Sequence, residues 1–125
     1  MRSYHVDIAR HVTDAERKWI DNLLSHFDIP GVETSRRGVS RRIAPIGIYH
    51  IALAHQLVLQ LGLPVKAAVA LAESLMRSDS PEFPICNGLW LFFDRPAFQA
   101  AVDARLVEAV EAVVPARRGR PPSQP

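Results

Sequence analysis

The chain has 125 residues, 48% of them hydrophobic, so it can bury the core of one compact domain and is too apolar to be disordered throughout. Its single cysteine, Cys86, excludes an internal disulfide and fits the reducing cytoplasm. The formal net charge is only +2, but every one of the fifteen basic residues except Lys18 and Lys66 is an arginine. The arginines are clustered, which is typical of a surface that binds an anionic partner rather than of a surface that only confers solubility.

Neither a secretory signal nor a membrane span is expected. Residues 1–10 carry charges with no apolar run behind them. Residues 43–63 are the one stretch that lacks acids and bases over a helical length, but His50 and His55 interrupt it and Gly62 ends it.

The N-terminal third predicts two helices joined by a tight turn. Residues 7–11 form the first, and Thr13 followed by Glu16 has the pattern of a capping box that starts a second helix over about residues 14–27. Apolar side chains recur on one side of this second helix, and we expect them to be buried: Ile20, Leu23, Leu24 and Phe27. Its opposite side is polar: Arg17, Lys18, Asp21, Asn22 and Ser25.

The middle of the chain predicts a polar connection and then two apolar helices. Residues 32–42 favour a short β-hairpin or an extended loop. A third helix follows over about 46–61, with Pro45 near its first turn, and a fourth over about 64–76. The two helices have so few charges that we expect them to be covered on more than one side, with a partner subunit as the expected cover.

The C-terminal part predicts a strand and a last helix. Asn87-Gly88 is a hairpin turn signal, and residues 89–93 read as a strand whose pairing partner the sequence leaves open. Asp94 should cap a helix over about 96–113, which Pro115 should end. The apolar stripe of this helix consists of Phe98, Val102, Leu106, Ala109, Val110 and Val113.

No catalytic or metal-binding constellation is visible, so we expect a protein that is not an enzyme and has no cofactor. His50 and His55 are five residues apart, which puts them on different faces of a helix, whereas zinc sites draw on i, i+4 pairs or on cysteine pairs. No phosphate-binding loop, dinucleotide-binding glycine pattern or nucleophile elbow occurs.

The order of the N-terminal elements is that of a helix-turn-helix followed by a wing. In that arrangement the second helix enters the major groove of DNA, and its exposed residues reach base edges. The candidate reading residues are Arg17, Lys18 and Asn22, because Arg and Lys can bind guanine and Asn can bind adenine. For this helix taken alone, a plain amphipathic surface helix is the favoured interpretation, because Asp14, Glu16 and Asp21 dilute its positive charge.

The arginine cluster after the second helix is the stronger sign of DNA binding. It places four cations and two serine hydroxyls, of Ser35 and Ser40, around Gly38. The candidate phosphate contacts are Arg36, Arg37, Ser40, Arg41 and Arg42. A solvated loop has no need of that density of positive charge.

Residues 8–76 resemble the winged-helix DNA-binding domain of the MerR-type regulators. The resemblance rests on Gly38-Val39-Ser40-Arg41-Arg42-Ile43, which is similar to the wing of that family, and on Leu61-Gly62-Leu63-Pro64-Val65 between two helices. It implies that the arginines of 36–42 contact the DNA backbone and that Arg17, Lys18 and Asn22 face the major groove. The family's Arg-aromatic-aromatic-Glu signature, long coiled-coil helix and metal-binding cysteines are missing, so its sensing function is not implied.

The C-terminal tail contains Arg118-Gly119-Arg120-Pro121, which matches the core of an AT-hook. In an AT-hook, glycine lets the backbone lie in the narrow minor groove and the two arginines extend along it. A disordered, solubilising tail is the alternative, and the sequence does not choose between the two.

These observations predict a mainly α protein with a winged helix-turn-helix domain (1–77), a strand-helix dimerisation element (78–115) and a flexible Arg/Pro tail (116–125). The expected function is that of a small transcriptional regulator, a cytoplasmic or nucleoid-associated homodimer bound to double-stranded DNA. The alternative is a protein-interaction module, antitoxin-like or an adaptor subunit, that uses its apolar helices and strand.

Overall fold

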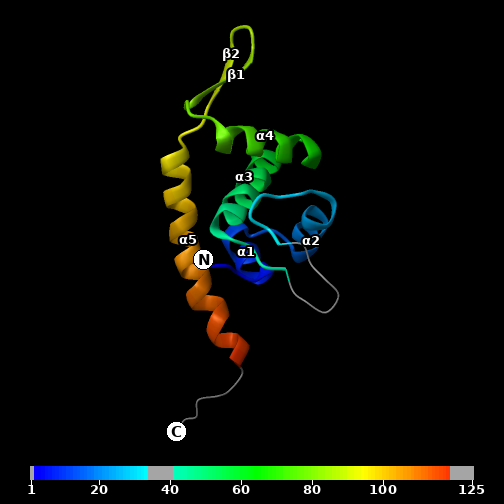
Figure 1. Ribbon diagram of the computed structural model, residues 1–125, viewed down its shortest axis with the longest axis vertical. Coiled ribbons are helices and arrows are strands. Elements are labelled where there is room, and N and C mark those ends of the chain that lie inside the picture. The colour runs from blue at the N-terminus through cyan, green and yellow to red at the C-terminus, as the bar shows by residue number, and fades with distance from the viewer. Residues whose placement is uncertain (1, 34–40, 119–125) are drawn as a thin grey trace.

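The computed structural model describes residues 2–33 and 41–118, and over these residues the protein is mainly helical with one small antiparallel sheet (Figure 1). In chain order the elements are α1 (Val6–Thr13), α2 (Arg17–His26), α3 (Pro45–Leu61), α4 (Val65–Arg77), β1 (Glu82–Cys86), β2 (Leu89–Phe92) and α5 (Arg95–Arg118). The predicted mainly α class is confirmed.

The turn between α1 and α2 differs from the predicted capping box. The Thr13 hydroxyl donates to the Ala9 carbonyl oxygen (2.8 Å) and accepts from the Ala15 backbone N–H (3.1 Å). Thr13 is therefore the last residue of α1, where a buried hydroxyl can bond back to the preceding helical turn. Asp14 then adopts a left-handed conformation, and α2 begins at Arg17 after Glu16, which makes no side-chain cap. The predicted start at residue 14 was wrong for this reason.

Three short backbone segments meet at Ile43, beside the start of α3. Ile43 bridges Tyr4 on one side, with hydrogen bonds of 2.7 and 2.9 Å, and Val32 on the other. The Glu33 N–H also donates to the Arg42 carbonyl oxygen (2.9 Å). The two ends of the connection predicted as a hairpin or loop thus run antiparallel at its base, while residues 34–40 lie outside the described part of the chain.

The helix pair α3 and α4 forms as predicted, because its ends are fixed by local chemistry. Pro45 occupies the first turn of α3, and Gly62 ends it in a left-handed conformation (φ 69°). The segment before α3 crosses that helix closely at Gly31, where an added Cβ would lie 2.7 Å from the Gly47 backbone nitrogen. Glycine is therefore required at position 31, which also has a positive φ of 85°.

The strand predicted after Asn87-Gly88 pairs with the residues just before that turn. In the hairpin β1–β2, Phe83 lies opposite Leu91 and Pro84 opposite Trp90, with an irregularity between Pro84 and Cys86. The predicted cap of the last helix is also confirmed, since Asp94 Oδ1 accepts from the Ala97 N–H (3.1 Å).

Helix α5 lies along α1 and α3 and covers the core of the N-terminal part (Figure 1). Its stripe is buried at Val102, Leu106 and Ala109, and the Tyr49 hydroxyl of α3 donates to Asp103 Oδ1 (2.6 Å). The cover of α3 that we expected from a partner subunit thus comes from the same chain. The segments 1–77 and 78–115 share one hydrophobic cluster.

The end of the last helix was predicted wrongly. Proline lacks the N–H of the helical ladder, so Pro115 was expected to end the helix, but α5 continues three residues further to Arg118. The predicted tail therefore starts inside α5. Across residues 2–33 and 41–118, no helix is both long and apolar enough to cross a membrane.

Candidate nucleic-acid interface

The polar side of α2 is exposed as its spacing predicted. Arg17, Lys18 and Asn22 are all exposed, whereas Ile20 and Leu23 on the opposite side are buried in the main core cluster. The apolar side fixes the helix on the protein, and the polar side is therefore free to meet a partner.

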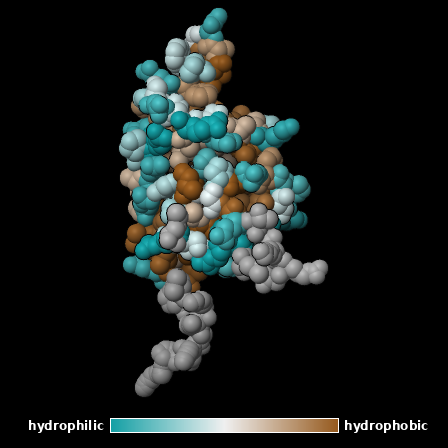
Figure 2. Space-filling model, in the orientation of Figure 1, coloured by the Kyte–Doolittle hydropathy of each residue, from teal (hydrophilic) through white to brown (hydrophobic). Residues whose placement is uncertain are grey.

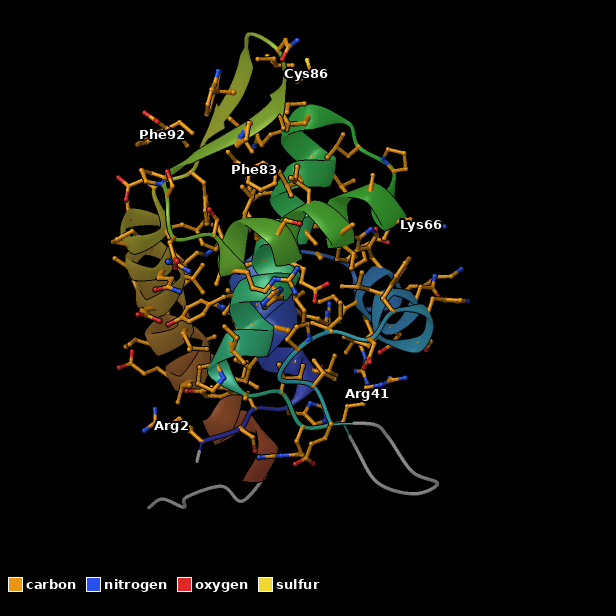
Figure 3. All side chains as sticks on the ribbon, turned by 45° about the horizontal axis from the view of Figure 1, so that its top comes forward. Arg2, Arg41, Lys66, Phe83, Cys86 and Phe92 are labelled. Carbon is orange, nitrogen blue, oxygen red and sulfur yellow. The ribbon has the colours of Figure 1, made fainter. Side chains whose placement is uncertain are left out.

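Arg41 joins this polar side from another part of the chain. Its guanidinium donates to the Ser25 hydroxyl (3.1 Å) and lies 4.0 Å from the Asp21 carboxylate, and both partners belong to α2 (Figure 3). The chain that leads out of residues 34–40 therefore returns against the exposed side of α2. At least one arginine of the predicted wing and the three candidate reading residues share one face of the molecule.

Arg42 has a different place from Arg41. Its guanidinium donates to both the hydroxyl and the carbonyl oxygen of Ser3, each at 3.1 Å. The backbone is extended here, so successive side chains point in opposite directions. Arg42 thus holds the N-terminal segment to the base of the connection, a positioning role that its clustering with Arg41 in the sequence concealed.

One carboxylate lies between the arginines of this face. Asp21 is 3.5 Å from Arg17 and 4.0 Å from Arg41, and Arg17 also pairs with Asp7 at 3.2 Å. These pairs are partly exposed, and such pairs contribute little to stability. The guanidinium groups can therefore exchange a carboxylate for a phosphate oxygen at low cost. The sequence placed Asp21 on the polar side but did not indicate these pairs.

An aromatic contact that the sequence analysis missed fixes α2 on α3. The rings of Trp19 and His55 meet edge to face with centroids 4.8 Å apart. His55 is only 9% exposed, and burial lowers the pKa of its imidazole, as it does for His50, which is 6% exposed. His55 Nδ1 has no hydrogen-bond partner among the residues that the structure describes. A neutral, packed imidazole therefore supports the orientation of α2.

The remaining candidate residues lie at or beyond the limits of the described chain. Arg36, Arg37 and Ser40 fall in the segment 34–40, and Gly119 and Arg120 follow the last described residue. Arg118 is the last residue of α5, so the AT-hook match begins on a helix end.

The described segments 2–33 and 41–118 contain no group of three or more His, Cys, Asp or Glu residues that could hold a metal ion. No protein-family model matches this chain, and no curated protein is significantly similar to it. The candidate site is a partly neutralised cationic face built on α2 and Arg41.

Proposed function

We propose that this protein is a small, non-enzymatic DNA-binding regulator of the winged helix-turn-helix type. The element order supports the proposal: two short helices joined by a tight turn, an antiparallel base at Val32 and Ile43, then two packed helices. The resemblance to the MerR-type domain over residues 8–76 implies the same order, with Gly38 to Ile43 as the residues similar to the wing.

The observation that carries the proposal is the position of Arg41. A single duplex can be bound by α2 and by the wing together only if both face the same way. Arg41 belongs to the proposed wing, directly after the segment 34–40, and contacts Ser25 and Asp21 on the exposed side of α2. Among the described residues, Arg41 connects the two proposed contact elements, and this contact supports the proposal that both can meet one duplex.

In the proposed complex, α2 enters the major groove and Arg17, Lys18 and Asn22 reach base edges. Arg41, with Arg36, Arg37 and Ser40 of the segment 34–40, contacts phosphates on the flanking backbone. Arg42 keeps its bond to Ser3 and orients the wing rather than binding phosphate. We also propose that Arg118, Gly119 and Arg120 add a minor-groove contact that raises affinity without adding sequence choice.

The decisive experiment is the salt dependence of binding to duplex DNA. Each phosphate contact contributes about 0.9 to the slope of log K against log salt concentration, so replacing Arg36, Arg37 and Arg41 by Ala should lower the slope by about 2.7. Arg77→Ala is the matched control, because that exposed arginine lies at the end of α4 and pairs with Glu73 of the same helix. A slope that is flat in the unmodified protein, or equal in the triple variant and the control, would refute the proposal.

A further inference from the structure

The hairpin β1–β2 has one face on the protein and one face in solvent. Phe83 and Leu91 pack against the second core cluster, which α3 and α4 form. Trp90 and Phe92 point the other way and are 59% and 67% exposed. The hairpin projects from the end of the molecule, and Figure 2 shows hydrophobic side chains there. Trp90 and Phe92 therefore lie side by side on the exposed face of β2.

The register shows which backbone groups of the hairpin face outward. The Phe93 N–H donates to the Pro81 carbonyl oxygen (2.8 Å), so this pair is hydrogen-bonded. Hydrogen-bonded and non-hydrogen-bonded pairs alternate in an antiparallel ladder. The N–H and C=O groups of Trp90 and Phe92 therefore point away from β1. No other strand in the described part of the chain pairs with this outer edge of β2.

The two edges of the hairpin are protected differently. At the outer edge of β1, Pro84 lies opposite Trp90 and has no N–H to offer, which blocks the addition of another strand. The outer edge of β2 has no proline, and no charged residue occurs anywhere in residues 83–93. Exposed edge strands usually carry a charge or a proline that prevents pairing. Only one edge of this sheet is open to a partner.

We propose that two copies of this chain pair through the outer edges of β2, antiparallel and about a two-fold axis at Leu91. This register places Trp90 of each copy opposite Phe92 of the other. The outward N–H and C=O groups of both residues then form four interchain hydrogen bonds, two for each Trp90–Phe92 pair. The edge is thus complementary to itself, and the two aromatic pairs stack across the strands.

A second copy fits this edge better than a charged partner. The uncharged strand offers no counter-charge to an acidic or basic segment, whereas self-pairing places no like charges opposite each other. Because Pro84 blocks the other edge, pairing stops at a four-stranded sheet, so the assembly closes as a dimer.

The size of the contact predicts a dimer that dissociates on dilution. Trp90 and Phe92 of two copies, at about 200 Å² per side chain and roughly three-fifths exposed, supply about 500 Å². Backbone edges and Leu89 add to this and bring the contact near the lower limit, about 1,000 Å², of specific interfaces. The α2 face lies away from the hairpin (Figure 1), so it stays exposed in both copies.

The first test is the molar mass of the full chain in solution without DNA, measured by sedimentation over about 1–100 µM, the range expected for so small an interface. The unmodified protein should shift from monomer to dimer, and Trp90→Lys should remain monomeric. Val107→Lys is the matched control, because Val107 on α5 is exposed to a similar degree (60%), and this variant should still dimerise. A monomer at all concentrations, an open series of larger species, or an equal effect of Val107→Lys would overturn the proposal.

The second test checks the register, and association of the mixed variants would also show that both variant hairpins still fold. Trp90→Lys and Phe92→Glu should each fail to self-associate, because each puts a charge opposite an aromatic ring. Mixed together they should form a heterodimer, with the new lysine opposite the new glutamate at one pair and the native Trp90–Phe92 pair at the other. Failure of the mixture to associate would refute this register. Since no DNA is present, the result is independent of the proposed function.

Discussion

Asp21→Asn is the sharpest perturbation of the proposed DNA-binding face. The carboxylate lies 3.5 Å from Arg17 and 4.0 Å from Arg41, so it neutralises two guanidinium groups at once. The pairs are partly exposed and should contribute at most about 1 kcal/mol each to stability, so the variant should fold. Without the charge, Arg41 loses its carboxylate partner and Arg17 keeps only its pair with Asp7 (3.2 Å), so both arginines have more capacity to bind phosphate.

The gain in affinity follows from Coulomb's law. A phosphate bound by Arg17 or Arg41 would lie about 7 Å from the Asp21 carboxylate, given a charged hydrogen bond of about 2.8 Å on the far side of the guanidinium. The repulsion that Asp21→Asn removes is then about 0.6 kcal/mol at a dielectric constant of about 80 and about 1.2 kcal/mol at about 40. These energies correspond to about three- to eightfold tighter binding.

Fluorescence anisotropy with a labelled duplex at low salt measures this change. Glu108→Gln is the control, because Glu108 is exposed on α5, so its removal changes the net charge equally without touching α2. Tighter binding of Asp21→Asn alone supports a face built on α2. Equal gains in both variants would show that only net charge matters, and no gain, or weaker binding, would refute the position of the DNA.

Three further predictions concern the scaffold. Gly31→Ala should lower the melting temperature much more than Gly62→Ala, because both have positive φ but only the first Cβ would meet other atoms within 4 Å; equal losses in thermal unfolding would contradict this. Burial lowers the pKa of His50 and His55 in the folded protein. The unfolded chain therefore binds more protons below about pH 6.5, so stability should be full above that pH and fall, by at most about 1.4 kcal/mol per pH unit for each group, as the pH drops toward the folded pKa values. A melting temperature that stays constant from pH 7.5 to 5 would contradict this predicted loss of stability. Tyr49→Phe should cost about 1 kcal/mol in chemical denaturation through the lost hydrogen bond to α5. Absorbance titration should find the pKa of the Tyr49 phenol raised to about 12, since the neutral hydroxyl donates a hydrogen bond to Asp103.

Local chemistry made the helix pair α3 and α4 predictable. Pro45 and Gly62 set helix ends through their own backbone preferences, and α2 showed its exposed side through helical spacing alone. Thr13 and Pro115 were misjudged because each has a common local role that the surroundings override. The buried Thr13 hydroxyl bonds back into α1, and α5 continues past its proline while packed along α1 and α3.

The parts of the candidate site that the sequence did not indicate are contacts between distant segments. Arg41 and Arg42 are neighbours with the same side chain, and only the extended backbone that bridges to Tyr4 and Val32 sends one to α2 and the other to Ser3. No spacing rule relates residues so far apart in the chain.

The edge-to-face contact of Trp19 with His55 also provides an optical signal within the protein. The chain has two tryptophans. Trp19 reports on the packing of α2 against α3, whereas Trp90 lies on the exposed hairpin. In the Trp90→Lys variant all indole fluorescence therefore comes from Trp19. Its emission should follow the protonation of His55 and any displacement of α2 by a bound duplex, so one unlabelled sample can report on both.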